Sequence, residues 1–97
     1  MRVAIPILKE RVAPYFGASS EILLMDIDGV SIFQETQLAV EGLEPLELAH
    51  RLVDFGVEKI ICGGINRFQK QWLMNKGVAV VDNVRGDARK MVETLLR

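Results

Sequence analysis

The second half of the chain alternates short apolar runs with amphipathic segments that end at glycine. Apolar residues in these segments recur with helical spacing, and Gly56 and Gly77 are typical helix stops. Each apolar run between them is short enough to be a buried strand. This rhythm is typical of parallel strands joined by right-handed helical crossovers. Three helices are predicted. The first is Glu44 to Phe55, the second is capped by Asn66 and ended by Gly77, and the third starts at Gly86-Asp87 and runs through Leu95 and Leu96. The predicted strands between them are Val57 to Cys62 and Val78 to Val81.

The first half predicts an antiparallel meander. Arg2 to Leu8 is a compact apolar run, although Pro6 favours a strand at a sheet edge or a bulge. Asp28-Gly29 is a strong hairpin signal between strands at Glu21 to Ile27 and Val30 to Ala39. The latter strand shows no clean apolar face, so we expect it at an edge. With Lys9 to Ser20 as a loop, the order is β-β-β-α-β-α-β-α.

Length and charge narrow the class of protein. A chain of 97 residues fits one domain, residues 1–97, and its 49% hydrophobic fraction suits an ordinary soluble globular protein. A net charge of −1 gives no reason to expect binding to nucleic acid or to a membrane. With one cysteine and one histidine, the chain forms no internal disulfide and no usual structural zinc site. No secretory signal is evident, so we expect a cytoplasmic protein.

The strand pattern predicts where a site would form. If the first, fourth and fifth predicted strands are parallel neighbours, the loops 9–20, 62–66 and 82–86 meet beyond their carboxyl ends. Two helix N-termini would point at the same edge, which suits an anion. Four cations lie in or beside these loops: Lys9, Arg11, Arg67 and Arg85. The sequence therefore predicts a site for a small anion or an anionic metal–sulfur cofactor.

The segment Ile61-Cys62-Gly63-Gly64 is the most informative part of this predicted site. Cys62 offers a soft metal ligand, or a thiol whose pKa a helix N-terminus would lower, as in a thiol enzyme or sulfur carrier. It could equally be a small buried hydrophobe. The glycines could expose backbone N–H groups to an anion, or serve only a tight turn. The sequence gives little indication of an enzyme. The only histidine, His50, lies on the first predicted helix, so no Ser–His–Asp triad can be assembled convincingly.

The chain also resembles a known family. Met1 to Pro6, Val12 to Ser19, Gly56-Val57 and Ile61 to Ile65 look like the dinitrogenase iron–molybdenum cofactor biosynthesis family, which includes NifX, NafY, the NifB C-terminal domain and the orange-protein type. The resemblance implies a ribonuclease-H-like, three-layer α/β fold with a mixed five-stranded sheet and three helices. It also implies non-catalytic binding or carriage of an iron–sulfur or molybdenum-containing cluster, exchanged with a donor or acceptor protein.

The resemblance and the loop pattern together give a set of candidate residues. They are Lys9, Arg11, Tyr15, Gly17, Gly63, Gly64, Asn66, Arg67 and Arg85 for the cofactor, with Cys62 for a metal. Tyr15 stands where many family members have a cluster-holding histidine, and a neutral phenol is a poor ligand for such a metal. An interaction module that has lost the cluster, as a monomer or weak homodimer, is therefore the alternative hypothesis.

Overall fold

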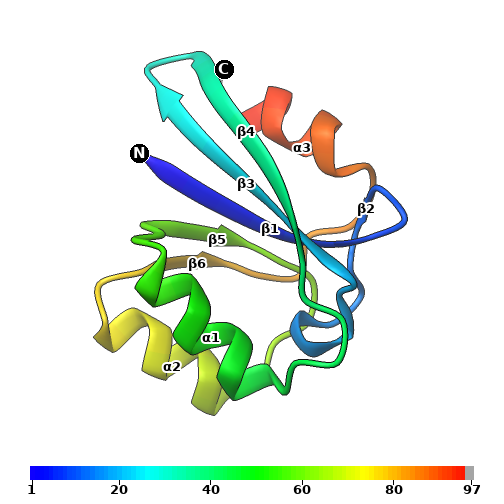
Figure 1. The fold of residues 1–97 in the computed structure, drawn as a ribbon, viewed down its shortest axis with the longest axis vertical. Coiled ribbons are helices and arrows are strands. Elements are labelled where there is room, and N and C mark those ends of the chain that lie inside the picture. Colours follow the sequence, from blue (N-terminus) through cyan, green and yellow to red (C-terminus); the bar gives the residue numbers. More distant parts are fainter. Residues whose placement is uncertain (96–97) are drawn as a thin grey trace.

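A computed structural model describes residues 1–95 as one mixed sheet covered by helices (Figure 1). The strands are β1 (Arg2–Leu8), β2 (Arg11–Val12), β3 (Glu21–Asp28), β4 (Ser31–Ala39), β5 (Lys59–Ile61) and β6 (Ala79–Val81). The helices are α1 (Pro45–Asp54), α2 (Arg67–Asn75) and α3 (Ala88–Leu95), with a 3₁₀ turn, η1 (Phe16–Ala18), after β2. The predicted Leu96 position of the last helix lies outside the described residues.

The sheet has the order β4-β3-β1-β5-β6, with β2 paired to the end of β1. β1, β5 and β6 are parallel, as predicted, whereas β3 and β4 run antiparallel to their neighbours. Figure 1 shows α1 and α2 together on one side of the sheet and α3 on the other. The fold is therefore a three-layer α/β arrangement, with one more strand than the five predicted.

Alternation along β1 divides the core into two apolar clusters. Ala4 packs with Leu48, Leu52 and Leu73 under α1 and α2. Val3, Ile5 and Ile7 point to the opposite face, where α3 covers them. Because side chains alternate across a strand, this fully apolar run is what a strand buried on both faces requires.

Pro6 shows why β1 changes partner. The sequence predicted an edge strand or a bulge there, but β1 is central, with β3 along one side. On the other side β5 pairs only with Val3 and Ala4, and β2 pairs with Ile7 and Leu8. Proline has no N–H to give to a ladder, so it sits where one neighbour ends and the next begins. The sheet opens between β5 and β2 at this point.

The local signals in the rest of the sequence are confirmed. Asp28 pairs with Ser31 across the predicted hairpin, and β4 lies at one edge of the sheet, as expected. The Asn66 side chain accepts a hydrogen bond from the Phe68 N–H (2.7 Å) and caps α2. None of the helices in residues 1–95 has the length and apolar character needed to cross a membrane.

Candidate anion-binding cleft

The three predicted loops meet beyond the carboxyl ends of β1, β5 and β6, and backbone hydrogen bonds join them. The Gly64 N–H donates to the Pro14 carbonyl (2.8 Å), and the Phe16 N–H donates to the Gly64 carbonyl (2.7 Å). On the other side, the Asn83 N–H donates to the Gly63 carbonyl (2.9 Å). The segment after β5 is therefore held between the other two loops.

Gly63 and Gly64 make this close approach possible. A Cβ at Gly63 would lie 2.6 Å from the Pro14 carbonyl oxygen and closer still to that of Ala13. A Cβ at Gly64 would meet the Tyr15 ring at 3.0 Å. The Gly64 N–H is already bonded to Pro14, so it does not point into open space as the sequence analysis had allowed. These glycines build the site by letting backbones touch.

A cleft of about 800 Å³ opens beside this junction. Its lining is mostly apolar, but its charged residues are all cations: Lys9, Arg11 and Arg85. None of the three forms an ion pair with another residue in 1–95. The complete lining is Leu8, Lys9, Arg11, Val12, Pro14, Tyr15, Gly63, Gly64, Asn83, Val84, Arg85 and Gly86. A chain with a net charge of −1 thus concentrates positive charge at one edge of its sheet.

A second cleft of about 640 Å³ lies across Tyr15 and Gly64 from the first. Gly17 and Asn66 line it, together with Asp82, whose carboxylate accepts a hydrogen bond from Lys70 (3.0 Å). This hydrogen bond lowers the pKa of Asp82, so the carboxylate stays ionised near neutrality. The structure therefore divides the predicted site residues between two clefts, and Arg67 lines neither.

Cys62 lies in the core, away from both clefts. Its side chain is fully buried with Phe16, Leu48 and Leu73 under α1 and α2. Burial, and then the negative charge of Asp82, raise the pKa of the thiol to about 12. The sequence had suggested a helix-lowered pKa as one alternative, and this is wrong because desolvation of the thiolate dominates. The placement favours Cys62 as a small buried hydrophobe.

The other potential metal ligands do not gather at the cleft. His50 packs against Trp72 at the α1–α2 contact, with ring centroids 4.5 Å apart and the ring planes tilted by 55°. Within residues 1–95 no three His, Cys, Asp or Glu side chains are grouped so as to hold a metal ion. The cleft lining instead offers guanidinium and ammonium groups, one phenol, an amide and backbone atoms.

Asn83 is a site residue that sequence reasoning missed. It lines both clefts and has a left-handed backbone (φ 60°). Asparagine tolerates this conformation better than most residues, so an Asn directly after a strand-ending Asp was an available signal. Lys9 (φ 52°) and Glu10 (φ 67°), at the β1–β2 turn, are the other non-glycine residues in 1–95 with positive φ.

Comparison with known proteins places the fold. No family model matches the sequence, and no curated protein matches it. The crystal structure of a protein called PH0822 superposes with a TM-score of 0.92 at 26% identity, covering 99% of this chain and 88% of that one. The crystal structure of a candidate dinitrogenase from Methanocaldococcus jannaschii gives a TM-score of 0.81 at 18% identity, covering 99% and 88%.

An NMR structure of a candidate NifB protein from Thermotoga, assigned to the DUF35 family, gives a TM-score of 0.73 at 22% identity. It covers 97% of this chain and 85% of that one. At such identities the likeness is one of fold. The chain therefore has the fold of proteins named for dinitrogenase and for NifB, and the relationship rests on structure.

Proposed function

We propose that this chain is a small, non-enzymatic accessory protein that holds an anionic cofactor, such as an iron–sulfur or molybdenum–sulfur cluster, in the cationic cleft. The observation that carries the proposal is the cleft lining: Lys9, Arg11 and Arg85, with no carboxylate among them. The ribonuclease-H-like classification, a cytoplasmic location and a cluster donor or acceptor as partner belong to the same proposal. The structural neighbours support it, since one of them is named as a candidate dinitrogenase and another as a candidate NifB protein.

The side chains decide how such a cofactor would be held. Cationic side chains at a partly apolar cleft favour an anion by charge and by hydrogen bonds, which are stronger when the groups are ionised. Direct ligation from the chain has little support, because Cys62 is buried and Tyr15 replaces the histidine implied by the resemblance. We therefore assign the binding of the anionic cofactor to Lys9, Arg11 and Arg85. Tyr15, 68% exposed, lines both clefts.

Anaerobic equilibrium dialysis against tetrathiomolybdate, a coloured molybdenum–sulfur dianion, tests this proposal. We expect one equivalent of molybdenum per chain, and weaker binding in Arg11→Gln and Arg85→Gln by roughly fivefold or more, as loss of a charged hydrogen bond implies. Arg51→Gln is the matched control, because Arg51 is exposed on α1 and lines neither cleft. Equal weakening in the control, or no bound molybdenum in the wild type, would contradict the proposal.

Cys62→Ala separates charge from ligation in the same assay. The alanine removes the sulfur and leaves the cleft lining intact, so binding should remain near the wild-type level. Loss of molybdenum in Cys62→Ala, with retention in the two arginine variants, would show that the thiol is a ligand and that the cationic residues are incidental.

The alternative is a protein-interaction module of the same fold that has lost cluster binding. Tyr15 in place of the expected histidine favours it, as does the long exposed edge strand β4. Two results together would support this second function. The chain would bind neither tetrathiomolybdate nor a cluster assembled from iron and sulfide, and it would still capture a defined partner protein.

A further inference from the structure

The cationic cleft is much larger than a small inorganic anion. Its volume of about 800 Å³ lies within the range of about 300–1,000 Å³ that is usual for sites of whole organic ligands. A four-coordinate anion such as tetrathiomolybdate would occupy only a small part of this space. The cleft also has an apolar or aromatic wall formed by Leu8, Val12, Pro14, Tyr15 and Val84. A bare inorganic anion would leave this wall in contact with water.

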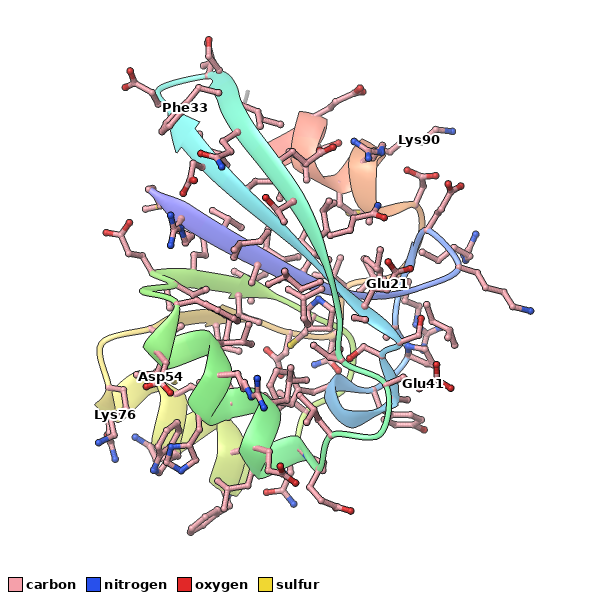
Figure 2. All side chains as sticks on the ribbon, viewed as in Figure 1. Glu21, Phe33, Glu41, Asp54, Lys76 and Lys90 are labelled. Atoms are coloured by element: carbon pink, nitrogen blue, oxygen red, sulfur yellow. The ribbon has the colours of Figure 1, made fainter. Side chains whose placement is uncertain are left out.

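The cations of the cleft come from two segments that are hydrogen-bonded to each other. Lys9 lies in the turn between β1 and β2, Arg11 begins β2, and Arg85 lies in the loop between β6 and α3. The Val12 N–H donates to the Gly86 carbonyl (2.9 Å), which holds the two segments side by side. Figure 2 shows nitrogen-tipped side chains projecting outward from the turn between β1 and β2. Three cations without an ion-pair partner in residues 1–95 suit a dianion.

Backbone donors in the same lining lack a partner within the described residues. Gly63 is buried, yet its N–H donates to no acceptor in residues 1–95, and the same holds for the N–H groups of Arg85 and Gly86. Gly63 and Gly86 have no side chains, so they line the cleft with backbone atoms. Buried N–H groups are nearly always paired with protein, water or a ligand. Guanidinium, ammonium and N–H donors together match the oxygen atoms of a phosphate group.

Tyr15 and the cations occupy different parts of the cleft. Tyr15 and Gly64 also line the second cleft, whereas none of the three cations does. The Tyr15 ring lies against the Gly64 backbone, 3.0 Å from where a Cβ at Gly64 would be, and the side chain is 68% exposed. An exposed aromatic ring can pack on another ring in an offset or edge-to-face arrangement. The cleft therefore combines a charged part with an aromatic part.

We propose that the cleft binds an aromatic organic phosphate, a phosphate monoester that carries a flat ring. The phosphate lies against Lys9, Arg11 and Arg85, and the ring packs on Tyr15 and covers the apolar wall. A phosphate monoester carries about −1.5 to −2 charges near neutrality, which the three cations match. The inference rests on the proposed function only in assigning the anionic group to these cations. It adds a class of ligand to which an inorganic cluster does not belong.

Three probes separate the two parts of such a ligand in titration calorimetry at fixed ionic strength. Naphthyl phosphate has both the ring and the charge, methyl phosphate has only the charge, and naphthol has only the ring. We expect one naphthyl phosphate per chain, bound at least about tenfold more tightly than either of the other probes, because only this probe uses the cations and buries apolar surface. If naphthyl phosphate does not bind, or binds no better than methyl phosphate or naphthol, the proposal is wrong.

Two variants test the position of the ring. Tyr15→Ala should weaken naphthyl phosphate binding by about three- to tenfold and leave methyl phosphate binding unchanged, because it removes only the aromatic contact. Phe68→Ala is the matched control, since Phe68 is a 73% exposed phenylalanine on α2 that lines neither cleft. Unchanged naphthyl phosphate binding in Tyr15→Ala, or equal weakening in Phe68→Ala, would overturn the placement of the ring on Tyr15.

The tetrathiomolybdate assay distinguishes this inference from the proposed function. A chain that binds naphthyl phosphate as described but no tetrathiomolybdate would support the inference and contradict the cluster proposal. A chain that binds tetrathiomolybdate, and binds naphthyl phosphate no better than methyl phosphate, would support the cluster proposal and overturn the inference.

Discussion

Gly63→Ala is the substitution that most directly tests how the site is built. No left-handed conformation is needed at this position, so alanine is acceptable to the backbone and the cost is one of space. The new Cβ would lie 2.6 Å from the Pro14 oxygen, and ordinary van der Waals contact begins near 3.4 Å. The loop at Ala13-Pro14 must therefore move by about an ångström.

That movement disturbs the hydrogen bonds from Gly64 to Pro14 and from Phe16 to Gly64. At about 0.5–1 kcal/mol for each of these two bonds, plus about 1–2 kcal/mol of overpacking, the expected loss in the free energy of unfolding is about 2–4 kcal/mol. For a domain of this size, such a loss lowers Tm by at least about 8 °C. Urea denaturation and a thermal melt measure both quantities.

Gly64→Ala is the matched comparison. A Cβ at Gly64 would contact a side-chain ring, which can move, whereas a Cβ at Gly63 would contact backbone atoms. Its Cβ would touch Tyr15 at 3.0 Å, and the exposed Tyr15 side chain can rotate away. We expect a loss of about 1 kcal/mol or less, typical of a surface adjustment. If Gly63→Ala stays within about 0.5 kcal/mol of the wild type, or Gly64→Ala costs more, the close-approach argument fails.

Three other perturbations follow from single features. Glu10→Gly should raise the free energy of unfolding by about 0.5–1 kcal/mol in urea, because glycine accepts the left-handed turn conformation that strains glutamate. Arg2 hydrogen-bonds Asp26 (2.8 Å) and lowers the pKa of that carboxyl, so its stabilisation is present above the unfolded pKa and is lost as pH falls through the folded value. The stability gap between wild type and Asp26→Asn should therefore shrink on acidification. Cys62, with a pKa of about 12, should resist iodoacetamide at pH 8 until urea unfolds the chain, and rapid native alkylation would contradict its burial.

The local elements of this fold were predictable because their signals are local. Glycines with positive φ follow α1 and α2 at Gly56 and Gly77, and Asn66 caps α2 through its own side chain. The alternation of helices with short apolar runs then fixed the parallel half of the sheet. These features depend on spacing and on residues a few positions apart, which a sequence displays directly.

The missed features depend on contacts between distant segments. β2 is two residues long, and it exists because the chain turns at Lys9-Glu10 and returns to pair with β1. Pro6 indicated an edge, but it occupies the gap between two successive neighbours of a central strand. Neither arrangement leaves a pattern in the sequence itself. The same holds for Gly63, whose neighbour is a carbonyl about fifty positions away in the chain.

The burial of Cys62 and the charge of the cleft together narrow how a bound group could be held. Attraction by exposed cations is screened by salt, with a Debye length of about 8 Å at physiological ionic strength and about 3 Å at 1 M. A metal–thiolate bond is nearly indifferent to ionic strength. Tetrathiomolybdate binding measured at two salt concentrations therefore distinguishes the two mechanisms. If Lys9, Arg11 and Arg85 hold the anion, its affinity should fall strongly at high salt. An affinity that does not depend on salt would require that the core opens to expose the Cys62 thiol.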